Sequence, residues 1–170
     1  MICLYALGLS QNQLNVHFTS KKPEPEVLIF IRHDCPISNG YAPEINRIYA
    51  RFKSHFNFHL VFEESISHSA AQKHLTQYNL GLPFLIDSSQ HLANSWRISV
   101  TPEVAVISSQ NKLLYEGRID DSYLTLGTRR VAVNQHDLID ALQQCVQGKA
   151  ISETKSPAIG CILNKPVVSK

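Results

Sequence analysis

The sequence lacks several features that would assign it to a common functional class. No apolar run approaches the roughly 18 residues needed to cross a membrane. The formal net charge of +2, from scattered basic residues, gives no footprint for nucleic acid. None of the four cysteines forms a C-x-x-C pair, so their spacing does not predict a zinc site. With 170 residues of ordinary composition, the chain is long enough to form one domain with a buried core.

The most informative stretch is Asp34–Ser38, because it places one cysteine between a strand and a helix. Val27–Ile31 is a short, continuous apolar run, which is typical of a strand buried on both faces. Apolar residues at steps of three and four then predict a helix over residues 37–54. Cys35 falls near the N-cap of this helix, with Pro36 at its first position. Free N–H groups and the helix dipole favour a thiolate there, so we expect Cys35 to be reactive.

Strands and helices alternate along the rest of the chain. We expect further strands at residues 59–63, 84–87, 103–107 and 113–116, and further helices at residues 67–78, 90–96 and 135–147. Asn134 is the expected cap of the last helix, with Asp137 in a capping-box-like position. A short polar turn joins the last two strands, which predicts a hairpin. The alternation predicts an α/β fold with parallel strands and an antiparallel edge.

The order of these elements resembles the thioredoxin fold, an α/β fold with a central mixed sheet and helices on both faces. Cys35 lies at the first strand–helix junction, and Ala42-Pro43 lies where thioredoxins bend their active-site helix. Thr101-Pro102 lies where the family keeps a cis-proline opposite the cysteine. Over roughly residues 25–163 the chain is similar to bacterial redoxin-domain proteins of the AhpC/TSA/TlpA-like branch. The motifs that carry this similarity are D-C-P-I-S-N at 34–39, Y-A-P-E at 41–44, E-G-R-I-D-D at 116–121 and G-C at 160–161.

The resemblance implies a thiol–disulfide oxidoreductase that acts on a protein thiol or disulfide partner. Cys35 would be the reactive thiolate, and Thr101 and Pro102 would form the opposite wall of the site. Ser38 replaces the second cysteine of thioredoxins, so it can hydrogen-bond a thiolate but cannot resolve a mixed disulfide. The tail of about 14 residues after the last helix spans roughly 45 Å when extended. We therefore expect Cys161 to fold back and pair reversibly with Cys35; the alternative is a tail cysteine without a partner.

Two other functional hypotheses follow from the same residues. No cofactor is expected for thiol chemistry, but copper is the alternative, because soft thiolates and an imidazole suit it. The candidate ligands are Cys35, Cys161 and His33, in the manner of SCO-like proteins. If no metal binds, His33 is expected either to tune the Cys35 thiolate or to cap the end of the strand.

The remaining hypothesis is a non-catalytic interaction module that contacts its partner through the loop at residues 117–133. The alternative role of that loop's charged residues is internal ion pairing. These residues are Asp120, Asp121, Arg129 and Arg130.

We divide the chain into an N-terminal segment at 1–24, a redoxin domain at 25–150 and a tail at 151–170. The first segment is expected to be a truncated export signal or an added strand, and Cys3 within it carries no clear signal. Cys145 shares a helical apolar stripe and is expected in the core. The expected location is periplasmic or otherwise exported, with the cytoplasm as the alternative, because a lasting disulfide suits an oxidising compartment.

Overall fold

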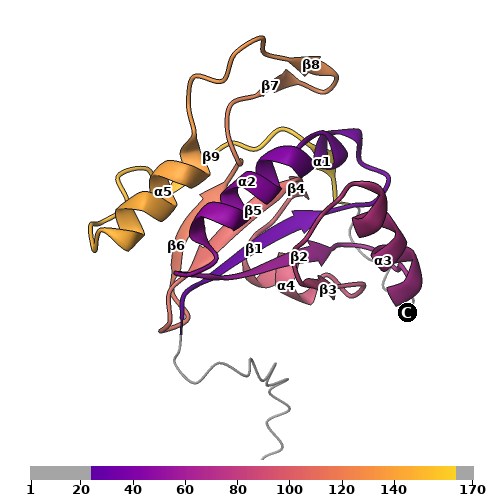
Figure 1. The fold of residues 1–170 in the computed structure, drawn as a ribbon, viewed down its shortest axis with the longest axis horizontal. Helices are drawn as coiled ribbons and strands as arrows, with labels where there is room; N and C mark the ends of the chain where they lie inside the picture. Colours follow the sequence, from indigo (N-terminus) through magenta and orange to yellow (C-terminus); the bar gives the residue numbers. More distant parts are fainter. Residues whose placement is uncertain (1–23, 164–170) are drawn as a thin grey trace, which may run out of the picture.

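The computed structural model of the protein describes residues 24–163, so the expected N-terminal strand or signal and Cys3 lie outside the described residues. A mixed sheet of six strands, in the order β3-β2-β1-β5-β6-β9, forms its centre (Figure 1). The strands are β1 (Glu26–Ile31), β2 (Asn57–Phe62), β3 (Phe84–Ile86), β5 (Glu103–Ile107), β6 (Leu113–Gly117) and β9 (Lys155–Ser156). β1 pairs in parallel with β2 and antiparallel with β5. The expected hairpin of β5 and β6 is present.

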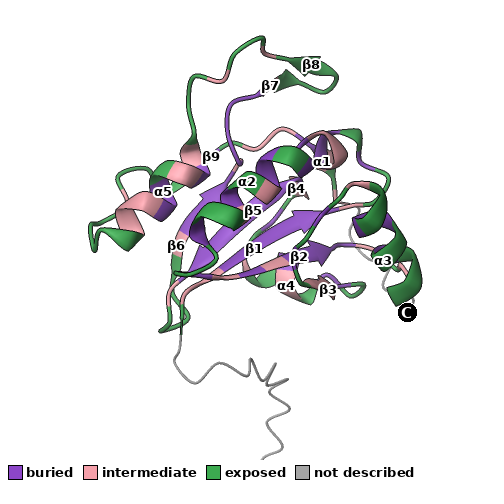
Figure 2. Cartoon of the chain, viewed as in Figure 1, coloured by how far each residue is buried: buried purple, intermediate pink, exposed green. Residues whose placement is uncertain are grey.

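Helices cover both faces of the sheet. They are α1 (Pro36–Gly40), α2 (Ala42–Phe52), α3 (His68–Gln77), α4 (His91–Ser95) and α5 (Asp137–Val146). Val27, Ile29 and Ile31 of β1 point into a large apolar cluster that includes residues of α2, α3 and α5. Leu28 and Phe30 point into a smaller cluster with Ala93 of α4. Because both faces of β1 are covered, the strand is buried almost throughout (Figure 2). The expected α/β, thioredoxin-like architecture is therefore confirmed.

The helix expected over residues 37–54 is two helices. α1 ends at Gly40, Tyr41 caps it, and α2 begins at Ala42 with Pro43 in its first turn. Pro43 has no N–H to donate to the preceding turn, and its ring hinders a continuous helix. The interruption turns α2 so that Ile45 and Ile48 are buried against the sheet.

The last helix begins later than expected. His136 is its N-cap residue and makes no side-chain capping bond. Asn134 does not cap it, because the helix begins three residues later; the backbone N–H groups of Asn134 and Gln135 donate to Oδ1 of Asp121 instead, at 2.8 and 3.1 Å. This aspartate competes successfully for these donors because a buried carboxylate needs hydrogen-bond partners.

Two regions expected to be irregular contain short strands. The loop at 117–133 carries a hairpin of β7 (Tyr123–Thr125) and β8 (Thr128–Arg129), which protrudes from the body of the molecule (Figure 1). In the tail, β9 adds to the edge of the central sheet, and β10 (Cys161–Ile162) pairs with β4 (Val100–Thr101). The tail is thus folded back across the domain.

Candidate active site

Cys35 is the N-cap residue of α1, and a short turn at residues 32–34 separates it from the end of β1. Its backbone is extended, with φ −86° and ψ 112°, and Pro36 opens the helix as expected. The N–H of Ser38 points at the Cys35 sulfur, 3.5 Å away. The whole residue is buried, with 0% of its surface exposed. The helix terminus therefore supplies a backbone donor to a sulfur that has no access to water.

Thr101 forms the wall opposite Cys35, and the Thr101–Pro102 peptide bond is cis. The Cys35 thiol donates to the carbonyl oxygen of Thr101 at 3.1 Å. Within the described part of the chain, the buried hydroxyls of Ser38 and Thr101 have no hydrogen-bond partner. An unpartnered buried hydroxyl is costly, and a thiolate at Cys35 would give the Ser38 hydroxyl an acceptor.

Cys161 reaches this wall because β10 pairs antiparallel with β4. The register sets Cys161 opposite Thr101 and Ile162 opposite Val100. Gly160 permits this approach: a Cβ added there would lie 2.1 Å from the carbonyl oxygen of Thr101. No side chain fits at that distance, so the glycine of the G-C motif has a steric role. The tail therefore brings Cys161 beside Thr101, whose carbonyl accepts from Cys35, and close enough to Cys35 for each thiol to shift the pKa of the other.

The two thiols differ in acidity. Burial acts to raise the pKa of Cys35, but hydrogen bonds from Cys161 and Ser38 to the thiolate outweigh it and lower the pKa below its usual value. Burial, the hydrogen bond to Cys35 and the charge of the Cys35 thiolate raise the pKa of Cys161. The carbonyl of Thr101 opposes ionisation of Cys35, because it can accept from a thiol but repels a thiolate. The opposite pKa shifts favour the thiolate form of Cys35 and the protonated form of Cys161.

His33 lies outside this pair. Its ring nitrogen Nδ1 and its backbone N–H each lie 2.7 Å from Oε1 of Glu64. Asp34 forms an ion pair with Arg32, and its Oδ2 lies 3.0 Å from the Nη2 of the guanidinium. The chain turns at residues 33 and 34 and does not continue as a strand toward Cys35.

The expected copper ligands are therefore only partly assembled. Cys35 and Cys161 lie together, and His33 lies apart. Among residues 24–163, two groups of three potential ligands have their donor atoms within 4.8 Å of one another, and neither contains a cysteine. The groups are His33, Asp34 and Glu64, and Glu44, Asp120 and His136.

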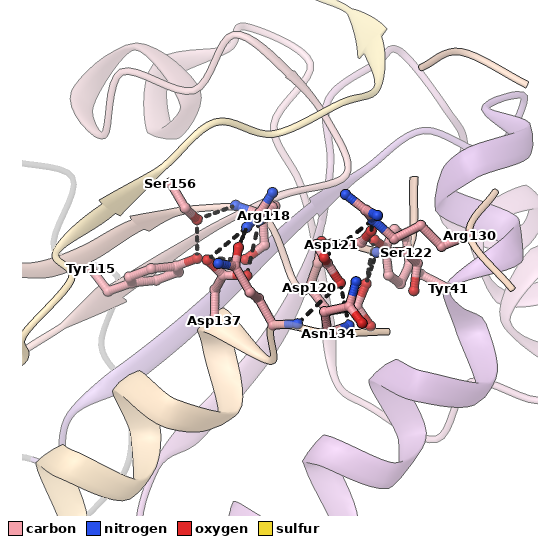
Figure 3. A network of polar contacts seen from close by, with 11 residues as sticks. Tyr41, Tyr115, Arg118, Asp120, Asp121, Ser122, Arg130, Asn134, Asp137 and Ser156 are labelled. Atoms are coloured by element: carbon pink, nitrogen blue, oxygen red, sulfur yellow. Dashed lines mark hydrogen bonds and ion pairs between the residues drawn. The ribbon is translucent and has the colours of Figure 1, made fainter. Parts of the chain in front are cut away.

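The E-G-R-I-D-D motif holds the tail and the protruding loop in place (Figure 3). Glu116 forms an ion pair with Lys155 of β9. A Cβ added at Gly117 would lie 2.2 Å from the carbonyl oxygen of Ser156, so this glycine admits β9 to the sheet edge. The Ser156 hydroxyl, in turn, lies 2.6 Å from the hydroxyl of Tyr115. Sequence reasoning missed these residues, although the paired motifs around Gly117 and Gly160 were a signal.

The second half of the motif ties the loop to the active-site helices. The Tyr41 hydroxyl donates to Oδ1 of Asp120 at 2.7 Å, and Tyr41 directly follows α1 (Figure 3). Asp121 forms an ion pair with Arg130 at 3.2 Å. Internal pairing thus accounts for part of the charge in this loop. The hairpin still exposes Leu126, so the structure leaves a contact surface available there.

Comparisons with known proteins identify the fold. No family model and no curated protein matches this chain. Among solved structures, an uncharacterized conserved protein from Geobacillus kaustophilus matches with a TM-score of 0.75 and 21% identity, over 86% of this chain and 80% of that one. A hypothetical protein from Sinorhizobium meliloti matches with a TM-score of 0.69 and 23% identity, over 86% of this chain and 82% of that one. A secreted disulfide oxidoreductase from Mycobacterium tuberculosis matches with a TM-score of 0.52 and 18% identity, over 72% of this chain and 82% of that one.

The class defined by this architecture is the thioredoxin-like fold, in which a cysteine at a strand–helix junction faces a cis-proline loop. At these identities the solved structures support the fold and not a particular activity. Among residues 24–163, none of the helices has the length and apolar character of a membrane span.

Proposed function

We propose that the protein is a thiol–disulfide oxidoreductase in which Cys35 attacks and Cys161 resolves. The observation that carries this proposal is the pairing of β10 with β4, which sets Cys161 opposite Thr101, the residue whose carbonyl oxygen accepts from the Cys35 thiol at 3.1 Å. Ser38 supports the reaction by donating to the Cys35 thiolate. The tail replaces the second cysteine that a C-x-x-C motif would supply within one helix.

Each turnover moves two electrons from the protein dithiol to a disulfide of a partner protein. The Cys35 thiolate attacks one partner sulfur, an S–S bond to Cys35 forms, and the other partner sulfur leaves as a thiolate that takes up a proton. Cys161 then loses its proton to solvent and attacks the Cys35 sulfur. The second partner sulfur leaves, and a Cys35–Cys161 disulfide remains. The reverse sequence oxidises a partner dithiol, since every step is an exchange.

The test is a direct map of the oxidised cysteines. We would reduce the full chain, expose it to oxidised glutathione, alkylate the free thiols and identify linked peptides by mass spectrometry. The expected product is a Cys35–Cys161 bridge that a reducing agent releases. In Cys161→Ser, glutathione is expected to accumulate on Cys35, because nothing displaces it.

Cys145→Ser is the matched control, because Cys145 lies partly buried in α5, with a pKa raised by burial. This variant is expected to form the bridge as the parent does. A parent protein that keeps Cys35 and Cys161 free under these conditions, or that links Cys35 to another cysteine, would refute the proposed pairing.

Copper binding is the second candidate, and the adjacency of two thiols is the observation that favours it. Thiolate sulfur suits Cu(I), and such a site would use Cys35 and Cys161 without His33. The expected result is that His33→Ala retains as much Cu(I) against a chelator as the parent. Loss of metal at the same chelator concentration in the parent would dispose of this candidate.

The proposed location is an exported one, because a disulfide that persists between turnovers suits an oxidising compartment. Fractionation of cells that express the full gene, followed by trapping of the cysteine redox state in each fraction, tests it. Recovery of the protein only in the cytoplasm, with both cysteines reduced, would argue against export.

A further inference from the structure

The segment Gly160–Leu163, here called the strap, covers the edge on which a partner strand would dock. Besides the pairing of β10 with β4, the N–H of Leu163 donates to the carbonyl oxygen of Ser99 at 3.0 Å. The strap therefore occupies the backbone groups of β4 that an extended polypeptide would need. Glu103 restrains the backbone at this edge, because its carboxylate accepts hydrogen bonds from the N–H groups of Ser99 and Val100.

The strap also closes the site. Cys35 has no exposed surface, while its sulfur must lie in line with a disulfide in order to attack it. The Cys35 thiol contacts the carbonyl of Thr101, and Cys161 pairs with that same residue. No disulfide from another protein can reach Cys35 while the strap is in place.

The strap is held far less firmly than the segment before it. Ser156 of β9 is buried, hydrogen-bonded to Tyr115 and flanked by the Lys155–Glu116 ion pair. β10 is as short as β9, but it belongs to a separate two-stranded sheet and not to the central sheet. Its Ile162 is 72% exposed. The strap can therefore detach from β4 while β9 remains in the central sheet, with the hinge between residues 157 and 159.

We propose that the strap is a built-in substrate mimic: it competes with partner proteins for the β4 edge, and it admits partners whose reacting cysteine lies in an extended segment directly after a glycine. This inference rests on the proposed exchange function. The glycine requirement follows from Gly160, where even a methyl group would lie 2.1 Å from the carbonyl oxygen of Thr101. Opening of the strap exposes Cys35 to the partner, and its return brings Cys161 back to resolve the mixed disulfide and displace the partner.

Alkylation of the reduced full chain by iodoacetamide tests the strap without any redox turnover. The rate at each cysteine is followed by mass spectrometry in the parent, in Gly160→Ala and in Leu163→Asp, which act on opposite ends of the strap. Leu163 packs against the apolar cluster below α4. In both variants Cys35 is expected to react at least about tenfold faster than in the parent. A tenfold rise corresponds to a docking free energy of the strap that is weaker by about 1.4 kcal/mol.

Two controls separate local opening from general loosening. Gly81→Ala is the matched glycine variant, because a Cβ at Gly81 meets nothing within 4 Å; its Cys35 rate is expected to equal that of the parent. Cys145 in α5 reports on the rest of the domain, and its rate is expected to stay constant. An unchanged Cys35 rate in both strap variants, or an equal rise at Cys145, overturns the inference. The Cys35–Cys161 bridge can still form in that case, so the two proposals fail separately.

Substrate mimicry has its own test in the open protein, Gly160→Ala combined with Cys161→Ser. Two short peptides, Ile-Gly-Cys-Ile and Ile-Ala-Cys-Ile, are supplied as mixed disulfides with thionitrobenzoate, and the released chromophore gives the rate. The glycine peptide is expected to react with Cys35 at least about tenfold faster. Equal rates would mean that the peptides do not bind as the strap does, and the mimicry would be wrong.

Discussion

Replacing Gly117 with alanine is expected to detach β9 and destabilise the whole protein. The added Cβ would lie 2.2 Å from the carbonyl oxygen of Ser156, and Gly117 adopts φ +148°, which side chains rarely do. The obstructing atom belongs to the backbone, so no rotamer change relieves the contact. Overpacking costs about 1–3 kcal/mol and the backbone conformation about 1–3 kcal/mol. The expected loss in the free energy of unfolding is therefore about 2–6 kcal/mol.

Urea denaturation followed by the fluorescence of Trp96, the single tryptophan, measures this loss. A loss of about 3 kcal/mol corresponds to a melting temperature lower by roughly 6–12 °C in a domain of this size. Gly81→Ala is the control and is expected to stay within about 0.5 kcal/mol of the parent. If Gly117→Ala unfolds at the same urea concentration as Gly81→Ala, the close approach of β9 to β6 is wrong.

Two further predictions concern ionisation. Ser38→Ala removes the hydroxyl that lowers the pKa of Cys35 and keeps the backbone N–H, so this pKa is expected to rise in a titration of thiolate absorbance; an unchanged pKa would mean that the hydroxyl does not stabilise the thiolate. Burial, and then the nearby Asp87, raise the pKa of Glu63 to about 9, well above its value in the unfolded chain. The folded state then holds a proton that the unfolded state has lost, so the contribution of Glu63 to stability is largest in acid and falls by about 1.4 kcal/mol per pH unit between about pH 6 and pH 8. The difference in free energy of unfolding between the parent and Glu63→Gln, measured by urea denaturation, is expected to change with pH by this slope. The difference between the parent and Glu153→Gln, an exposed control, is expected to stay constant with pH.

Much of the fold can be predicted because its signals are local. The apolar run of β1 and the spacing of Ile45 and Ile48 each depend on one element and the face that it buries. The errors have local causes too. Pro43 interrupts the first helix, and Asp121 binds the backbone N–H groups of Asn134 and Gln135, so the last helix begins after them.

Part of the candidate site could likewise be predicted from local signals, and part could not. Cys35, Ser38 and Thr101 lie at element ends that the sequence predicts, so their mutual approach follows from the resemblance to the thioredoxin fold. The position of Cys161 depends on a strand of two residues that pairs with β4, far away in the sequence. So short a strand has no periodicity. Its one sequence signal is Gly160, and only the position of the Thr101 carbonyl explains that glycine.

Placing the second thiol on a docked tail links the chemistry of the site to the stability of that docking. In a C-x-x-C motif one helix holds both sulfurs, whereas in the proposed mechanism the docking of the tail, which the close approaches at Gly117 and Gly160 permit, sets how often Cys161 is next to Cys35. The docking equilibrium sets the effective concentration of one thiol at the other. A tenfold fall in that concentration raises the reduction potential by about 30 mV for a two-electron couple, which makes the disulfide easier to reduce. Gly117→Ala is therefore expected to raise the potential of the Cys35–Cys161 couple in a glutathione redox titration. An unchanged potential in a destabilised variant would mean that β9 does not control the docking of Cys161.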